Sequence, residues 1–216
     1  TLNIPYPEKG NIQFKLQKFP DGQNNTVINI KTIPENTQEI RILSRLNNWI
    51  DVEILICIVK CLNELGYKRL HLFNPMFLGA RSDRKFEEGG NWYLKQVICP
   101  IINSLNFESV TVLDAHSYVL GNLLTNYKAI DNSQLISFSV RDILINNDNA
   151  HIKDIIYIAP DAGASHKIYK SLEAANIEDQ DIIICSKERD AQGNLTQTKV
   201  PLRAEAHKYK DFIIID

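Results

Sequence analysis

A strong net charge is absent from this chain of 216 residues, and so are long apolar runs. The formal charge is −2 at pH 7, whereas bulk nucleic-acid binding needs a clustered positive surface, so we expect no nucleic-acid partner. No apolar run approaches the ~20 residues that span a bilayer, and the first residues show no signal-like pattern. We therefore expect a protein of the cytoplasm without contact with a membrane.

Cysteine is also scarce, with four residues in the whole chain. Cys57 and Cys61 stand one helical turn apart, but no histidine or second cysteine pair has the spacing that would complete a zinc site. We interpret these two and the isolated Cys99 and Cys185 as buried, reduced thiols, as in a reducing cytosol. Low-complexity tracts and short-period repeats are absent as well.

Three runs rich in isoleucine and valine each end in an aspartate: residues 109–114, 155–161 and 212–216. Continuous apolar runs of this length predict buried strands of a parallel sheet. Ligands of open α/β sheets bind just beyond the carboxyl ends of the strands. Asp114, Asp161 and Asp216 are therefore candidates for a site that binds a metal, a ribose or a phosphorylated ligand.

Strands alternate with helices along the rest of the chain, which predicts an α/β protein with a parallel sheet in each half. Helical spacing predicts a first helix capped by Asp51 and a second over residues 92–102, kinked at Pro100. Residues 127–150 are polar and weakly periodic, so we place a domain junction near residue 127. The predicted domains are residues 1–126 and 127–216.

A basic segment follows the predicted strand of residues 69–73: Arg81, Ser82, Asp83, Arg84 and Lys85. Arginine grips phosphate through bidentate hydrogen bonds and lysine as a point charge, so the segment could hold a polyphosphate. On composition alone, a solvated basic loop is the stronger interpretation.

Other polar residues also follow predicted strands. Asp114 and His116 could be partners of a divalent ion on phosphate, although a lone histidine is more often structural. Asp161 leads into a predicted helix, whose N-terminal amides attract anions. Lys187 and Arg189 open a polar stretch that could close over a transferring phosphoryl group, or could form an ordinary surface hairpin.

The order of these segments resembles that of the ribose-phosphate pyrophosphokinases, the phosphoribosyl pyrophosphate synthetases. The matching segments are Phe-Pro-Asp-Gly-Gln at residues 19–23, Arg-Ser-Asp-Arg at 81–84, Asp-Ala-His-Ser at 114–117, Pro-Asp-Ala-Gly at 160–163 and Lys-Glu-Arg at 187–189. The resemblance implies two phosphoribosyltransferase-type domains and a magnesium-dependent transfer of the β,γ-pyrophosphate of ATP to the anomeric hydroxyl of a ribose phosphate, with release of AMP.

The resemblance also implies a role for each matching residue. Phe19, Asp21 and Gln23 correspond to a segment that reaches the adenine site of a neighbouring subunit, which implies a homo-oligomer, at least a dimer, with a shared ATP site. Residues 81–84 correspond to the ATP-binding loop. His116 and Asp161, with Asp114 nearby, correspond to the metal-linked positions. Lys187 and Arg189 correspond to the catalytic loop, and Asp216 to the first acidic residue of the loop that binds the acceptor's phosphate.

Departures from the family pattern bear on the acceptor. Gln23 replaces a glutamate and Ser82 a glutamine, and Gly89-Gly90 follows the basic segment. These features resemble a divergent branch, found in phages and in bacterial pathways that rebuild NAD, whose acceptor is ADP-ribose. Such a protein would work in the host cytoplasm if a phage encodes it. The acceptor is therefore either ribose 5-phosphate or ADP-ribose.

The family continues beyond the position of Asp216, so we expect the second domain to be incomplete at its C-terminus and the chain to be a fragment. Two rival functions remain open. A phosphoribosyltransferase shares the fold but has no ATP loop of the kind seen at residues 81–84. A non-catalytic regulatory homologue would not need Lys187, Arg189, His116 and Asp161 together.

Overall fold

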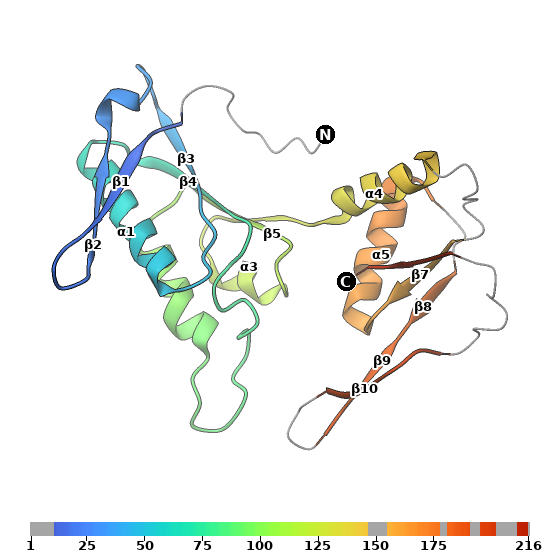
Figure 1. Cartoon of the computed structure of the whole chain (residues 1–216). Helices are drawn as coiled ribbons and strands as arrows, with labels where there is room; N and C mark the ends of the chain where they lie inside the picture. The colour runs from blue at the N-terminus through green and yellow to red at the C-terminus, as the bar shows by residue number, and fades with distance from the viewer. Residues whose placement is uncertain (1–10, 147–154, 178–180, 191–194, 202–210, 216) are drawn as a thin grey trace. The chain divides into compact units, whose positions relative to one another are not determined.

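The structure is a computed structural model that describes residues 11–146, 155–177, 181–190, 195–201 and 211–215 (Figure 1). The chain forms two compact units that divide between Asp131 and Asn132. We call them the N-terminal and the C-terminal unit. The sequence placed the junction near residue 127, before strand β6 (Tyr127–Ile130), whereas β6 pairs within the sheet of the N-terminal unit.

The N-terminal unit is built on a parallel sheet with the strand order β3-β4-β5-β6. Strands β3 (Glu39–Leu43), β4 (Arg69–Asn74) and β5 (Ser109–Leu113) precede β6 in the chain. Leu70, Leu72, Val110 and Val112 are at most 2% exposed, because the central strands are covered by other elements of the unit. All four carboxyl ends lie along one edge of this sheet.

Helix α1 (Trp49–Glu64) packs its apolar stripe into the core of this unit, where Val52, Leu55, Val59 and Leu62 are buried. The N-cap is Asn48, and not Asp51 as the sequence predicted. The Asn48 side chain accepts hydrogen bonds from the backbone of Ile50 and Asp51, while the Asp51 carboxylate accepts from the Asn48 N–H. The two residues therefore form a reciprocal capping box.

The predicted helix over residues 92–102 consists of two segments. A wide π-helical turn, η2 (Leu94–Ile98), runs directly into helix α2 (Cys99–Asn103). Pro100 lies at the start of α2, just after the Cys99 N–H closes the last π-helical bond to the Leu94 carbonyl. The expected irregularity at Pro100 therefore takes the form of a change in helix type. The short helix α3 (Val119–Leu123) follows β5.

An antiparallel hairpin of β1 (Phe14–Lys18) and β2 (Asn24–Ile28) precedes the sheet. A single 3-10 turn, η1 (Ile30–Thr32), joins it to the rest of the unit. In Figure 1 the hairpin is the blue ribbon that lies alongside α1. Every residue of β1 is exposed, whereas Thr26 in β2 is 6% exposed, so β2 is the strand that packs against the unit.

The C-terminal unit has a parallel sheet with the order β11-β7-β8. Its strands are β7 (Ile155–Ala159), β8 (Ile182–Ile184) and β11 (Asp211–Ile214). Helices α4 (Ser133–Asn146) and α5 (Ala162–Ala175) pack on each other, and Val140, Tyr157, Ile168 and Leu172 lie in one buried cluster. An antiparallel hairpin of β9 (Ser186–Arg189) and β10 (Leu195–Lys199) follows β8.

The predicted fold class, α/β with mainly parallel sheets flanked by helices, is confirmed. Among the helices of the described residues, none has both the length and the hydropathy to cross a bilayer.

Candidate functional site

The predicted ATP loop follows strand β4 and has a defined backbone. The Ser82 N–H donates to the Gly79 carbonyl at 2.8 Å, and the Leu94 N–H donates to the Ser82 carbonyl at 3.3 Å. Arg81 and Arg84 are exposed, while Ser82 and Asp83 are partly buried. The Arg84 guanidinium lies 5.3 Å from the centre of the Phe86 ring. Both arginines can therefore reach a ligand from a loop that is fixed at its two ends.

Gly79 is required at the start of this loop. Its φ of +75° favours glycine, and a Cβ there would lie 2.7 Å from the Tyr93 ring. Tyr93 in turn meets Trp49 edge to face, with the ring centroids 6.4 Å apart. The loop therefore packs against the Tyr93 ring, which contacts Trp49, the first residue of α1.

Asp114 and His116 follow β5, the strand next to β4. Asp114 adopts a left-handed backbone with φ of +46°, and its N–H donates to the Ile130 carbonyl at 2.7 Å. The His116 side chain is exposed. Because Asn74 of β4 pairs with Val112 of β5, the two following loops leave the sheet at the same edge. The fold therefore brings the predicted ATP loop and the Asp114–His116 turn to one side of the N-terminal unit.

The third predicted nucleotide segment forms the tip of the β1–β2 hairpin. The Phe19 N–H donates to the Gln23 carbonyl and the Gly22 N–H to the Phe19 carbonyl, both at 2.9 Å. Phe19, Asp21 and Gln23 are all exposed, and Phe19 keeps 52% of its surface accessible. The Gln23 amide lies against the Asp21 carboxylate, and its nitrogen, turned toward Asp21, donates to both carboxylate oxygens. A glutamate at position 23 would instead repel Asp21, so this tip carries one negative charge where two are usual in the family it resembles.

In the C-terminal unit, Asp161 and Lys187 are in direct contact. Asp161 is the N-cap of α5, where one carboxylate oxygen accepts from the Ala164 N–H at 2.9 Å. The other oxygen accepts from the Lys187 ammonium at 2.5 Å. The hydrogen bond from Lys187 holds the pKa of the Asp161 carboxyl below its usual value, and the Ala164 N–H acts in the same direction. The carboxylate is therefore ionised at neutral pH and is matched by a cation 26 positions away in the sequence.

The β9–β10 hairpin presents Lys187 through its strand register. Lys187 lies opposite Thr198, whereas Ser186 lies opposite Lys199, so alternation along β9 puts Lys187 and Glu188 on opposite faces. The Lys199 ammonium pairs with the Glu188 carboxylate on the second face. Arg189 is the last residue of β9. The two predicted catalytic positions, Lys187 and Arg189, are thus one period of the strand apart.

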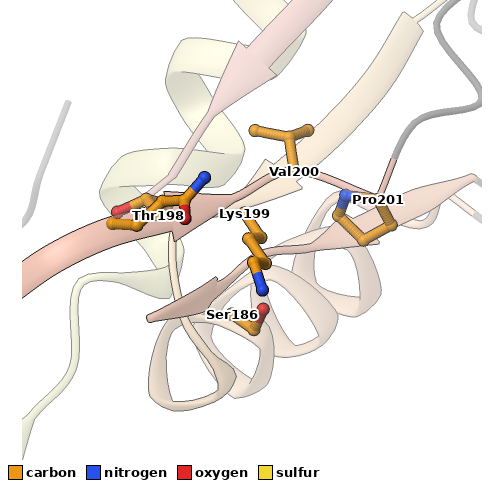
Figure 2. Close-up of a pocket in the computed structure, with 6 residues that line it drawn as sticks. Ser186, Thr198, Lys199, Val200 and Pro201 are labelled. Carbon is orange, nitrogen blue, oxygen red and sulfur yellow. The ribbon is translucent and has the colours of Figure 1, made fainter. Parts of the chain in front are cut away.

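An open hollow of about 570 Å³ lies along β10, lined by Ser186, Gln197, Thr198, Lys199, Val200 and Pro201 (Figure 2). The Lys199 side chain extends toward Ser186 in this view. None of the residues predicted from the sequence lines this hollow. The hollow therefore lies apart from the Asp161–Lys187 contact.

Asp216, the predicted acceptor-binding residue, lies outside the described residues. The sequence analysis also did not indicate two polar residues that lie beside the predicted segments. Asn74 ends β4 with its side chain 0% exposed and its Oδ1 without a hydrogen-bond partner, beside the start of the predicted ATP loop. Glu53 of α1 binds the residue that follows the hairpin tip, Asn24. The Asn74 side-chain nitrogen donates to the Ser44 carbonyl at 2.6 Å. This contact and that of Glu53 with Asn24 join segments distant in sequence, so no local pattern could have indicated them.

The described residues hold no group of three or more histidine, cysteine or acidic side chains arranged for a metal ion. Mg²⁺ usually needs fewer protein ligands, because it is bound through one or two carboxylates together with the phosphates of the substrate. Asp161 meets that requirement as an ionised carboxylate at the carboxyl end of a strand, although Lys187 now occupies one of its oxygens. Asp114 offers a second carboxylate and His116 an exposed imidazole in the N-terminal unit. In each unit taken by itself, these donors fit an ion that arrives with phosphate.

Comparison with known proteins places the chain near one kind of enzyme. No protein-family model matches the sequence. The chain is 25% identical over 203 residues to a ribose-phosphate pyrophosphokinase of Saccharolobus solfataricus, and this match covers 92% of the chain and 64% of that protein. The crystal structure of a phosphoribosylpyrophosphate synthetase from Mycobacterium smegmatis superposes with a TM-score of 0.70 at 11% identity, over 94% of this chain and 62% of that one.

These similarities show the fold of a phosphoribosylpyrophosphate synthetase, with its phosphoribosyltransferase-type architecture. The chain spans less than two thirds of the length of both proteins.

Proposed function

We propose that the protein is a magnesium-dependent pyrophosphokinase that transfers the β,γ-pyrophosphate of ATP to the anomeric hydroxyl of a ribose phosphate-type acceptor and releases AMP. The observation that carries the proposal is the contact between Lys187 and Asp161 at the carboxyl end of β7. A polar surface hairpin without a function has no need to place its lysine on the N-capping carboxylate of a neighbouring helix. The similarity to a ribose-phosphate pyrophosphokinase supports the same activity.

In the proposed reaction the hydroxyl oxygen of the acceptor bonds to the β-phosphorus of ATP. The bond from that phosphorus to the oxygen bridging the α and β phosphates breaks, AMP leaves with the bridging oxygen, and the hydroxyl proton is lost. Proteins catalyse such transfers chiefly by positioning the reactants and by neutralising the charge on phosphoryl oxygens. No covalent intermediate with the protein is required.

Different residues would position the reactants and neutralise the charge on the phosphoryl oxygens. Arg81 and Arg84, exposed on a loop with fixed ends, hold the triphosphate through bidentate hydrogen bonds. Lys187 and Arg189, on β9, neutralise the charge that develops on the transferring group. Mg²⁺ bound with the substrate phosphates would supply further neutralisation of the phosphate oxygens. Asp161 is the candidate donor in the C-terminal unit, and the Asp114–His116 turn is the candidate in the N-terminal unit.

Lys187 must leave Asp161 before it can neutralise phosphoryl oxygens. An ammonium that is already paired with a carboxylate contributes little to the charge on another group. The resting contact at 2.5 Å therefore describes the hairpin before the reaction, with the lysine held within reach of the strand end.

The exposed hairpin tip with Phe19 supports the further proposal that the nucleotide site is shared between subunits. An aromatic ring that keeps 52% of its surface accessible at the end of a hairpin is suited to stack on a base supplied elsewhere. On this proposal the protein is at least a dimer. Sedimentation analysis with and without ATP tests the stoichiometry.

The acceptor is either ribose 5-phosphate or the larger ADP-ribose, and AMP release decides between them. The protein at its natural length is incubated with ATP, Mg²⁺ and one acceptor at a time, and AMP and the pyrophosphorylated product are followed by chromatography and phosphorus NMR. AMP formation that depends on one acceptor identifies it. Failure to form AMP with either acceptor, in a protein that still binds ATP, would refute the catalytic proposal and favour a regulatory homologue.

A further inference from the structure

The outer edge of strand β2 is bound by side chains of helix α1. The Asn29 N–H donates to the Gln13 carbonyl and the Phe19 N–H to the Gln23 carbonyl, which fixes the alternation of hydrogen-bonded pairs between β1 and β2. By that alternation, the backbone groups of Asn24 and Thr26 point away from β1. They would be unpaired edge groups if nothing covered them.

Three residues of α1, each one turn further along, meet this edge: Glu53, Cys57 and Cys61. The Cys61 thiol donates to the Thr26 carbonyl at 3.4 Å, and the Cys57 thiol lies 3.9 Å from the Asn24 carbonyl. Burial, and the nearby Glu53 carboxylate to a smaller degree, raise the pKa of the Cys57 thiol. The raised pKa keeps the Cys57 thiol protonated, as its contact requires. Cys57 and Cys61 are both half-buried, and not fully buried as the sequence predicted.

Glu53 makes the strongest contact with this edge. Its Oε1 accepts from the Asn24 N–H at 3.1 Å and its Oε2 accepts from the Asn24 side-chain amide at 2.5 Å. A carboxylate that accepts two hydrogen bonds from one residue restricts that residue's orientation as well as its position. Asn24 directly follows Gln23, the last residue of the hairpin tip, so the contact stands at the base of the tip.

We propose that Glu53 is a positioning residue for nucleotide binding, which acts by fixing the hairpin tip through Asn24. The proposal rests on the proposed function, because it is Phe19, Asp21 and Gln23 at the tip that would meet the adenine. The root of the hairpin has its own anchors, since Thr26 is 6% exposed and Ile28 packs against the core of the unit. Loss of the Glu53–Asn24 contact should therefore release the tip while the root stays in place.

A complementary pair of substitutions tests the contact. Glu53→Ala removes both acceptors, and Asn24→Asp opposes two carboxylates. The double variant Asn24→Asp with Glu53→Gln restores a donor opposite an acceptor at both contacts, because the glutamine oxygen accepts from the backbone and its nitrogen donates to the aspartate. Glu64→Gln, the glutamate-to-glutamine change of the double variant at an exposed position of α1, serves as the matched control.

Hydrogen exchange at residues 17–25, measured without substrate, gives the first readout. We expect faster exchange in each single variant, and wild-type exchange in the double variant and in Glu64→Gln. Steady-state kinetics at natural length give the second readout. We expect each single variant to raise the KM for ATP about tenfold, with kcat and the KM for the acceptor within about twofold of wild type, and the double variant to regain the wild-type KM.

The two readouts separate failure of this proposal from failure of the proposed function. If the single variants exchange like wild type, or if the double variant recovers neither property, Glu53 does not position the tip, whatever reaction the protein performs. If exchange follows the predicted pattern but the KM for ATP is the same in all variants, the contact is structural only and the positioning role is refuted. If wild type forms no AMP, the binding constant for ATP replaces KM as the second readout.

Discussion

A carboxylate of a neighbouring helix contacts each of the two hairpins in the described residues, but the two contacts are of different kinds. The β1–β2 hairpin is held by Glu53 of α1, which accepts from the backbone and the neutral amide of Asn24. The β9–β10 hairpin is held by Asp161, which accepts from the charged Lys187. Asn24 has no proposed part in the reaction, so its contact can persist through turnover. Lys187 does have one, so its contact must break in each cycle.

If the proposed function holds, this difference teaches that the residue that positions the hairpin and the residue that acts in the reaction are separate in the N-terminal unit and are the same residue in the C-terminal unit. The Glu53–Asn24 contact can be strong without slowing the proposed reaction, because it does not have to break. The Asp161–Lys187 pair is about one third exposed, at 35% and 29%, and solvent weakens a pair of this exposure. A weak contact is suited to Lys187, because in the proposed reaction this lysine must leave Asp161.

Replacing Lys187 gives the largest expected effect. We expect Lys187→Ala to lower turnover at least ~100-fold, since a preorganised cation contributes about 2–4 kcal/mol of barrier reduction. The melting temperature should change little because the ion pair is partly exposed. Steady-state kinetics and thermal unfolding measure the two effects. A variant that turns over near the wild-type rate would remove Lys187 from the mechanism.

Replacing Asp161 separates its two roles. Asp161→Ala removes the N-cap of α5 and should lower the free energy of unfolding by about 1 kcal/mol, whereas Asp161→Asn keeps a good cap and should change it little. Both variants should lose turnover, because both remove the carboxylate proposed for the metal. Urea unfolding and AMP release measure the two properties. Equal unfolding free energies for the two variants would show that the cap contributes nothing.

The alkylation rates of the cysteine thiols show whether the β1–β2 hairpin stays attached to α1. Burial raises the pKa of Cys99 to about 12, so this thiol should resist alkylation at neutral pH. Cys57 and Cys61 lie beneath β2, and we expect Asn24→Asp to speed their reaction with iodoacetamide several-fold while Cys99 stays unchanged. Mass spectrometry of peptides quantifies each site. Equal acceleration at Cys99 would point to global unfolding instead of local release.

The smallest effect is expected for the other ion pair of the second hairpin. Lys199→Ala removes the partner of Glu188, and both side chains are about half exposed, at 54% and 50%. An exposed pair contributes less than about 1 kcal/mol, so turnover should fall less than about fivefold. A loss as large as that of Lys187→Ala would show that the register of β9, rather than the charge of Lys187, carries the catalytic effect.

The parts of the fold that could be predicted from the sequence depend on local patterns. Runs of isoleucine and valine indicated β5, β7 and β11. Burial was predicted correctly for β5 and β7, because a central parallel strand is apolar on both faces. It was wrong for β11, an edge strand in which Phe212 is 48% and Ile214 68% exposed.

Helix α4 was not predicted, because its segment was judged polar and weakly periodic. Ile136 and Val140, one turn apart, do pack in the core of the C-terminal unit. The buried Ser133 and Ser137, however, weaken this helical signal.

For the candidate site, too, only local patterns could be predicted. Each predicted residue was proposed from a short motif, and the strand order of the N-terminal sheet explains why the loops after β4 and β5 share an edge. The contacts of Lys187 with Asp161 and of Glu53 with Asn24 cross 26 and 29 positions. Such contacts follow from the tertiary packing of separate elements, on which spacing along the chain carries no information.

Helix α1 contacts both segments that we propose for nucleotide binding. Glu53, in its second turn, binds Asn24 at the base of the hairpin tip, while Trp49, its first residue, packs edge to face on the Tyr93 ring that occupies the space beside Gly79. A change in the tilt of this one helix would therefore displace both the hairpin tip and the loop that carries Arg81 and Arg84. On the proposed function, such a tilt would change the affinity for the nucleotide.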